Sequence, residues 1–208
     1  MIRKTRVKID PGHTIDPDVI LGYPSPRKGK RPSLSIGRKA RIRSGSVIYA
    51  GTSIGSEFET GHHVIVREDN RLGDSVKIWN NSTIDYGCRI GHGVKIHCNC
   101  YIAQNSILED NVFLAPGVIF ANDQYPGNAA SGKQLRGPTL RKGVQVGVNS
   151  TLLPYITVGA GTLIGSGSVV TRDLPAGVVA WGNPARIHKR VKDLKIAETL
   201  RVLNRKTR

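Results

Sequence analysis

The stretch that decides the fold is Ile84-Asp-Tyr-Gly-Cys-Arg-Ile90-Gly-His-Gly-Val-Lys-Ile96-His-Cys-Asn-Cys-Tyr-Ile102, in which isoleucine returns at every sixth residue. The same step continues in both directions, with one break, through Ile36, Ile42, Ile48, Ile54, Thr60, Val66, Leu72, Ile78, Ile84, Ile90, Ile96, Ile102, Leu108, Leu114, Phe120, Leu140, Val146, Leu152, Val158, Ile164 and Val170. A surface helix repeats about every 3.6 residues and a half-buried strand about every 2, so neither explains this pattern. Hexapeptide repeats form a parallel β-helix, in which three hexads close one triangular coil and residues eighteen apart stack.

The repeat divides the chain into one long domain and a short tail. We assign residues 1–185 to a single all-β domain with two protruding loops, about residues 22–33 and about residues 122–139. The first loop is rich in Pro, Gly and Lys, and the second fills a step of twenty residues, instead of six, between Phe120 and Leu140. The tail, residues 186–208, has a weak helical pattern and many basic residues, which predicts an α-helix that caps the last coil.

The charge is concentrated at the two ends of the sequence. The 208 residues have a formal net charge of +16, yet ten basic and ten acidic residues balance between residues 44 and 185. Basic ends attract anionic surfaces and polyphosphates. Few aromatic residues lie among these basic residues, which leaves little surface for bases to stack on, so we expect no nucleic-acid partner.

Neither a membrane span nor a secretory signal is expected. No uninterrupted apolar run approaches the ~18 residues that a span needs, and the start, Met1-Ile-Arg-Lys-Thr-Arg6, lacks a hydrophobic stretch. Cys88 and Cys100 occupy a hexad position that normally points inward, which favours buried thiols over disulfides. These features predict a cytoplasmic protein.

The repeat, the loop near residue 122 and the exit sequence Val178-Val-Ala-Trp-Gly-Asn-Pro-Ala-Arg186 together resemble the left-handed β-helix acyltransferases with hexapeptide repeats. The resemblance covers roughly residues 36–190. It implies a left-handed coil, although ordinary crossover connections have the opposite hand. It also implies a homotrimer that binds acetyl-CoA between neighbouring subunits.

Within this superfamily, one branch N-acetylates UDP- or dTDP-linked aminosugars, and it is similar to the segment Leu108-Glu-Asp-Asn-Val-Phe-Leu-Ala-Pro-Gly-Val-Ile-Phe-Ala-Asn-Asp-Gln-Tyr-Pro126. By this resemblance, Asn122 matches the substrate-binding Asn of the branch and Asp123 matches a frequent partner. His97 aligns with a His that a neighbouring subunit contributes. The branch has an acidic residue where this chain has Gln104, which leaves the exact sugar open.

The spacing of the repeat also groups polar residues in one column. Gln104 and Asn122 hold the same hexad position one coil apart, and stacked strands lie ~4.8 Å apart, so both amides can reach one ligand. Tyr86 and Glu68 continue the column. We interpret Asn122, Asp123, Gln104 and Tyr86 as substrate-binding residues. The alternative is a ladder of amides that only satisfies backbone groups.

A second column becomes narrow above His97. It runs Trp79, His97, Ala115, Gly147 and Gly165, so its side chains shrink to methyl groups and hydrogens. We expect a groove for the pantetheine arm of CoA, with exposed backbone groups for its amides. The cofactor-binding candidates are Ala115, Gly117, Gly147 and Gly165 along the wall, and Arg186 and Lys189 at the basic end, where they would bind phosphates. Tight packing between subunits would select the same small residues.

His97 is the candidate catalytic residue. A neutral imidazole can accept the proton that an amine loses as the amide forms, which contributes about 10²–10⁴ in rate. Equally, His97 can orient the substrate while the amine attacks unaided, because positioning alone supplies much of the acceleration. An N–H near Ala115 or Gly117 would stabilise the oxyanion.

Three other functions stay open. O-acetylation of a sugar or serine hydroxyl suits the fold, although relatives of that kind place a His near the corner Asn and residues 115–140 contain none. A zinc-dependent γ-type carbonic anhydrase needs three His at one interface, whereas His62, His92 and His97 lie on different coils or corners, so we expect no metal. A non-catalytic assembly would use the basic ends. We favour an acetyl-CoA-dependent N-acetyltransferase for a UDP- or dTDP-linked aminosugar in surface-glycan synthesis.

Overall fold

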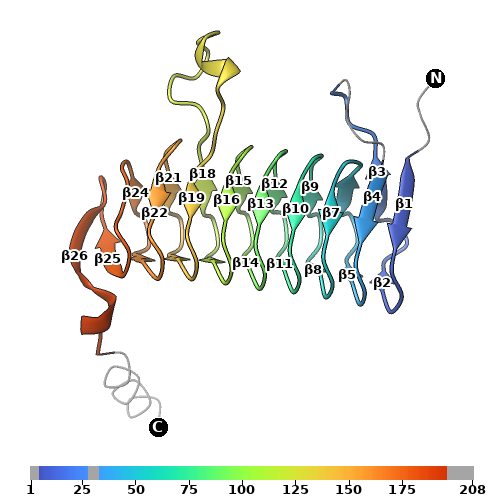
Figure 1. Ribbon diagram of the computed structural model, residues 1–208, viewed down its shortest axis with the longest axis horizontal. Coiled ribbons are helices and arrows are strands. Elements are labelled where there is room, and N and C mark those ends of the chain that lie inside the picture. The colour runs from blue at the N-terminus through green and yellow to red at the C-terminus, as the bar shows by residue number, and fades with distance from the viewer. Residues whose placement is uncertain (1–4, 28–32, 196–208) are drawn as a thin grey trace.

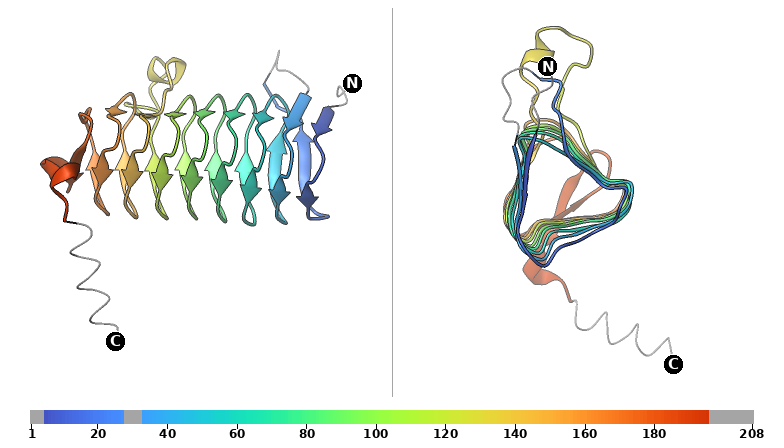
Figure 2. Two further views of the ribbon diagram at one scale, coloured as in Figure 1. Left: turned by 60° about the horizontal axis from the view of Figure 1, so that its bottom comes forward. Right: turned by 90° about the vertical axis from the view of Figure 1, so that its right-hand side faces the viewer.

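The chain winds into a three-sided coil. A computed structural model describes residues 5–27 and 33–195. Figure 1 shows the strands of successive coils side by side, and the view along the coil axis in Figure 2 shows a triangular cross-section. Short parallel strands stack into three sheets. The parallel β-helix predicted from the six-residue repeat is therefore confirmed.

The three sheets are called A, B and C in the order in which the chain visits them. Sheet A contains β1 (Arg6–Ile9), β4 (Ser33–Ile36), β7 (Ser53–Ile54), β10 (Arg71–Leu72), β13 (Arg89–Ile90), β16 (Ile107–Leu108), β19 (Thr139–Leu140) and β22 (Thr157–Val158). Sheet B contains β2 (Thr14–Ile15), β5 (Arg41–Ile42), β8 (Glu59–Thr60), β11 (Lys77–Ile78), β14 (Lys95–Ile96), β17 (Phe113–Leu114), β20 (Gln145–Val146), β23 (Leu163–Ile164), β25 (Val178–Trp181) and β26 (Arg186–Arg190). Sheet C contains β3 (Ile20–Tyr23), β6 (Val47–Tyr49), β9 (Ile65–Val66), β12 (Thr83–Ile84), β15 (Tyr101–Ile102), β18 (Ile119–Phe120), β21 (Thr151–Leu152) and β24 (Val169–Val170).

The repeated residue of each hexad fills the interior of the coil. No repeat position between Ile36 and Val170 is more than 6% exposed, and burying such a side chain contributes roughly 1.5–3 kcal/mol. Thr60, the polar exception, is also buried, and its hydroxyl accepts the N–H of Arg43 at 3.0 Å. The prediction of buried thiols is confirmed, since Cys88 and Cys100 are buried and free. Burial raises their pKa to about 12 and about 11, respectively.

Two segments leave the coil at the same corner, where sheet C turns into sheet A; we call it the CA corner. One lies between β3 and β4, and the other, residues 121–138, lies between β18 and β19 and includes the 3-10 turn η1 (Ser131–Lys133). Figures 1 and 2 show the described part of the first segment, residues 24–27, and the longer segment on one edge of the prism. The register resumes after the longer segment, because Leu108 pairs with Leu140.

The predicted capping α-helix over residues 186–208 is wrong for the part that the structure describes. Residues Arg186–Arg190 form β26, which pairs antiparallel with β25, and the 3-10 turn η2 (Val191–Asp193) follows. An added strand forms hydrogen bonds with the backbone groups on the free edge of β25. This pairing outweighs the weak helical preference of the segment. Residues 196–208 of the predicted helix lie outside the described residues. The described residues contain no helix that is long and apolar enough to cross a membrane.

Candidate functional site

The polar column predicted from the spacing lies at the CA corner. Glu68, Tyr86, Gln104 and Asn122 each stand two residues after a sheet C strand, and β9, β12, β15 and β18 pair in register one coil apart. Both protruding segments start from this corner. The structure therefore brings these four side chains onto one edge, beneath the two loops.

A buried network of ion pairs closes one end of the column. Glu68 is fully buried, and Arg67 donates to its two carboxylate oxygens at 3.2 and 3.3 Å. Arg67 also donates to Asp85 at 3.2 Å, and the Tyr101 hydroxyl donates to the other Asp85 oxygen at 2.8 Å. Partial burial lowers the pKa of Arg67, but the charges of Glu68 and Asp85 raise it overall. Burial, together with the hydrogen bond and charge of Asp85, raises the pKa of Tyr101.

The shorter loop lies over this network. The Arg27 guanidinium carbon is 3.5 Å from the centre of the Tyr86 ring, and its Nε is 3.8 Å from Glu68 Oε1. A cation over an aromatic face is attractive. One face of Tyr86, a predicted substrate-binding residue, is therefore covered by the loop. Sequence reasoning missed Arg27 and Arg67, because the only signal for them was an acidic residue, Glu68, in the column.

Gln104 and Asn122 lie beneath the longer loop. Their backbone carbonyls accept the N–H groups of Gly137 at 2.9 Å and Arg136 at 3.0 Å, so the loop is anchored to both residues. Gln104 is only 7% exposed, and its Oε1 is buried with no hydrogen-bond partner among the described residues. An acceptor buried in this way costs about 1–3 kcal/mol, and each such group needs an explanation. A ligand that offers an N–H or O–H group would supply one.

Asp123 shapes the longer loop from within. Its Oδ1 accepts the N–H of Tyr125 at 3.0 Å and also the hydroxyl of Ser131. The loop and Tyr155 of the next coil together border a cavity of about 470 Å³, lined by Gln124, Tyr125, Asn128, Ala130, Ser131, Gln134 and Tyr155. One carboxylate oxygen of this predicted substrate-binding residue is therefore engaged in holding the loop's shape.

His97 lies at a different corner, where sheet B turns into sheet C; we call it the BC corner. Its ring stacks on Trp79 with centroids 4.4 Å apart and touches Phe113 at 5.0 Å. Within the described residues of one chain, neither ring nitrogen has a hydrogen-bond partner. Strand β15 separates His97 from Gln104. A single chain therefore does not bring the candidate base to the polar column.

The column above His97 continues in the predicted register. Ala115, Gly147 and Gly165 follow on successive strands, and Trp181 of β25 comes next. A Cβ on Gly147 would lie 2.5 Å from the backbone nitrogen of Ser166, and one on Gly165 would lie 2.8 Å from Trp181 Cβ. Close passage of the next coil is therefore sufficient to explain both glycines.

The backbone donors predicted along this column are already engaged. The N–H of Ala115 donates to Val146 at 2.9 Å, and that of Gly117 donates to Cys98 at 2.9 Å. The N–H groups of Gly147 and Gly165 likewise donate to the next coil at 2.8 Å. The N–H groups of Ala115 and Gly117 themselves are therefore engaged in the stacking of the coils, and the oxyanion donor expected near them stays a prediction.

The basic candidates lie at the far end of this column. In the antiparallel pair, Arg186 faces Trp181 and Lys189 faces Val179. The Trp181 ring stacks on His188 with centroids 3.5 Å apart and an interplanar angle of 6°. The strand that replaced the predicted helix thus carries Arg186 and Lys189 beside the last rung of the column.

The histidines do not converge in one chain. His62 and His97 belong to the BC corner, whereas His92 belongs to the corner between sheets A and B. Among the described residues, no three His, Cys, Asp or Glu side chains are grouped so that they could hold a metal ion.

Comparisons with known proteins found similarities to hexapeptide-repeat transferases. The family model for the bacterial transferase hexapeptide (six repeats) matches residues 87–122. The serine acetyltransferase of Buchnera aphidicola is 33% identical over 111 residues, which are 49% of this chain and 40% of that protein. The galactoside O-acetyltransferase of Escherichia coli is 27% identical over 162 residues, which are 74% of this chain and 80% of that protein. The chain thus spans less than half the length of the first relative.

Among solved structures, UDP-N-acetylglucosamine acyltransferase from Campylobacter jejuni has the same fold. It superposes with a TM-score of 0.55 at 16% identity and covers 91% of this chain and 81% of its own. The six-residue repeat, the three-sided coil and these similarities together show a β-helix of hexapeptide repeats that is similar to known acyltransferases and shares their fold.

Proposed function

We propose that the protein transfers an acetyl group from acetyl-CoA to a polar acceptor, and that it works as a homotrimer with its site between neighbouring subunits. The single observation that carries the proposal is the buried, unpartnered Oε1 of Gln104 at the CA corner. An acceptor oxygen held there calls for a ligand with N–H or O–H groups. Cytoplasmic location and a role in surface-glycan synthesis remain predictions.

The outward face of sheet C supports the trimer. Its column is uncharged along its whole length: Ile20, Val47, Ile65, Thr83, Tyr101, Ile119, Thr151 and Val169. Ile65 and Ile119 are 37% and 39% exposed, whereas the outward columns of sheets A and B contain charged residues. If three such faces packed around a threefold axis parallel to the coil axis, these uncharged side chains would be buried away from water.

This packing would join the two corners that one chain keeps apart. The BC and CA corners are the two edges of sheet C, so the BC edge of one subunit meets the CA edge of the next at the same height. His97 and Gln104 belong to the same coil. His97 would therefore face Gln104 and Asn122 across the interface, where it can act on an acceptor that those amides hold.

The column of small residues would lie beside acetyl-CoA. Four rungs separate His97 from Trp181, which is about 19 Å at ~4.8 Å a rung. We expect the pantetheine arm to extend along Ala115, Gly147 and Gly165, with its phosphates near Arg186 and Lys189. Because the backbone N–H groups along the column are engaged, the arm would be held by shape rather than by those donors.

A hydroxyl acceptor is the first to test. The relatives named above are a serine acetyltransferase and a galactoside O-acetyltransferase. In this reaction the acceptor oxygen attacks the thioester carbonyl while His97 takes the hydroxyl proton. The new C–O bond forms, the C–S bond breaks, and the sulfur of CoA leaves with the proton returned by His97.

An amino acceptor, on a UDP- or dTDP-linked aminosugar, is the second candidate. The observation that favours it is that no carboxylate of the described chain orients the His97 ring. A neutral amine needs less help from a base than a hydroxyl does, so positioning by Asn122 and Gln104 would carry more of the catalysis.

The experiment is a thiol-release assay with acetyl-CoA and a panel of serine, galactosides, and UDP- and dTDP-linked aminosugars. Release with hydroxyl acceptors alone selects O-acetylation, and release with aminosugars alone selects N-acetylation. Wild-type protein that releases no thiol with any acceptor would refute the proposed function. Ile119→Glu tests the trimer, since a charge on the sheet C face should give monomers in sedimentation and abolish release; a trimeric variant would refute the interface.

A further inference from the structure

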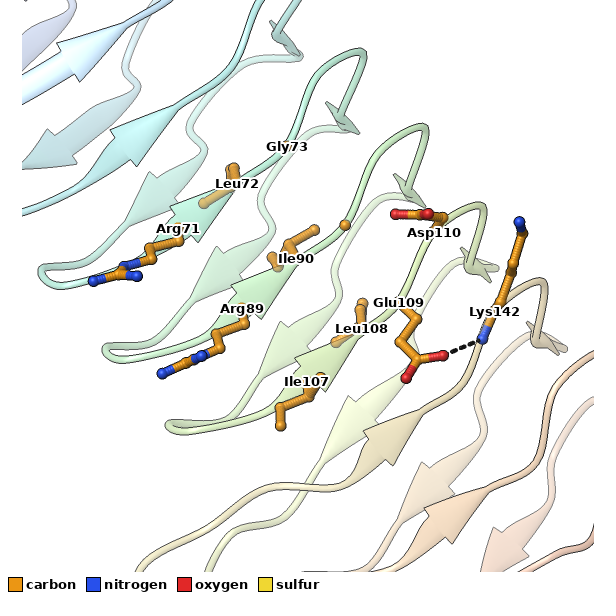
Figure 3. Close-up of a pocket in the computed structure, with 11 residues that line it drawn as sticks. Arg71, Leu72, Gly73, Arg89, Ile90, Ile107, Leu108, Glu109, Asp110 and Lys142 are labelled. Atoms are coloured by element: carbon orange, nitrogen blue, oxygen red, sulfur yellow. Dashed lines mark hydrogen bonds between the residues drawn. The ribbon is translucent and has the colours of Figure 1, made fainter.

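Sheet A carries a pair of arginines without a counter-ion. Arg71 of β10 and Arg89 of β13 are direct partners on neighbouring strands. Both side chains are exposed, and Figure 3 shows them extending from the sheet to the same side. Neither forms an ion pair with any residue that the structure describes.

Sheet B shows how the same coil balances charges elsewhere. Glu59 lies between Arg41 and Lys77 at the equivalent strand position and pairs with them at 3.6 and 3.2 Å. Like charges directly opposite each other on neighbouring strands are destabilising, and the alternation of sign removes that cost over these three strands, whereas Lys95 on the next strand lies opposite Lys77. Arg71 and Arg89 have no such carboxylate between them, so an anion from outside the chain would relieve their repulsion.

The arginines border a cavity of about 480 Å³ on the outer face of sheet A (Figure 3). Gly73 and Gly91 form part of its floor. A Cβ on Gly73 would lie 2.9 Å from the Gly91 carbonyl carbon, so the coils pass too closely for a side chain there. At these two glycines the floor is bare backbone, which a ligand can approach closely, and Ile107 also lines the cavity.

The carboxylates at the far side of the cavity already have partners. Glu109 accepts Nη1 of Arg141 at 2.6 Å and the N–H of Lys142 at 2.9 Å, the second of which is drawn in Figure 3. The hydrogen bond from Arg141 is the main cause that lowers the pKa of Glu109. Asp110 accepts the N–H of His92 at 2.8 Å. In the part of the chain that the structure describes, these acids bond to other groups, and neither forms an ion pair with Arg71 or Arg89.

We propose that Arg71 and Arg89 bind a phosphoryl group, a phosphate or diphosphate, of a ligand that lies across sheet A. Guanidinium groups one strand apart, ~4.8 Å, can each donate two parallel hydrogen bonds to non-bridging phosphate oxygens. This inference rests on the proposed function and adds to it, because β10 and β13 begin directly after the CA corner. A phosphorylated acceptor whose reactive end lies at Gln104 and Asn122 has its phosphoryl group on this side.

The test is a calorimetric titration of the intact protein with inorganic pyrophosphate, UDP and CoA. The double variant Arg71→Gln/Arg89→Gln should bind pyrophosphate at least tenfold more weakly than wild type, and the wild-type affinity should fall as salt is added. Arg41→Gln is the matched control, since Arg41 holds the same strand position but has Glu59. Circular dichroism melts of all variants check that the coil is intact.

The ligands identify the source of the phosphoryl group. A larger loss for UDP than for CoA in the double variant assigns the site to the acceptor, and the reverse assigns it to CoA; either outcome supports the anion site. Equal binding of pyrophosphate by wild type and double variant, no binding by wild type, or an equal loss in Arg41→Gln would overturn it. The titration measures binding and not acetyl transfer, so its result is independent of the thiol-release assay described above. If the protein binds pyrophosphate but releases no thiol, the proposed function is refuted and the anion site still stands.

Discussion

Replacing Glu68 by Gln tests whether the buried network supports the CA corner. The substitution keeps the size of the side chain but removes the charge that Arg67 faces at 3.2 Å and Arg27 at 3.8 Å. Removing one partner of a buried pair costs about 3–5 kcal/mol. Arg67 keeps Asp85 at 3.2 Å, and the two arginine side chains are 29% and 34% exposed. We therefore expect the lower end of that range, about 3 kcal/mol.

The loss is measured by urea unfolding followed by circular dichroism. For a domain of this size, about 3 kcal/mol corresponds to a fall of about 6–12 °C in Tm. Glu57→Gln is the control, because the Glu57 side chain is 57% exposed and lies 3.9 Å from Lys39, and exposed pairs contribute about 0–1 kcal/mol. A loss below about 1 kcal/mol for Glu68→Gln, or equal losses in the two variants, would refute the assigned role of the network.

Three further predictions can each be tested by one experiment, two by substitution and one by thiol labelling. His97→Asn should slow acetyl transfer by about 10²–10⁴ without changing the melt, and full activity would remove His97 from the site. In the native protein at pH 8, Ellman's reagent should modify Cys98 but not the two buried thiols, whose pKa burial raises to about 12 and about 11; peptide mass spectrometry would show any exception. Gly165→Ala should lower the free energy of unfolding by about 1–3 kcal/mol, because its Cβ would lie 2.8 Å from Trp181 Cβ, whereas Gly132→Ala, with nothing within 4 Å, should be neutral. Equal stability of these two glycine variants would contradict that reasoning.

The six-residue spacing was enough to predict the coil, its interior and the stacking of residues one turn apart. Each hexad buries one large side chain, so the position of that residue sets the register of everything beside it. The column that contains Gln104 and Asn122, and the column from Trp79 to Gly165, followed from this rule alone. The insertion before Leu140 did not disturb it.

The spacing could not predict which hydrogen bonds and side-chain contacts the groups around those columns form. It shows which residues stack, but not that the N–H groups of Ala115 and Gly117 are consumed by stacking. It gave no sign that Arg27 reaches Tyr86, since that contact joins a loop without a repeat to the coil. The exit segment has both a weak helical pattern and the extended length to pair with β25, and the free sheet edge decided in favour of a strand.

Leu108 pairs with Leu140 in the normal register although residues 121–138 lie between their coils. The strand register therefore does not depend on the length of this loop. A segment that departs and returns on the same rung can be shortened, extended or exchanged while the strands on either side keep their partners. The loop over the proposed acceptor site can thus be changed separately from the coil. Grafting the corresponding loop of another coil at residues 121 and 138 should change the acceptor used in the proposed acetyl transfer and leave the melting temperature nearly unaltered.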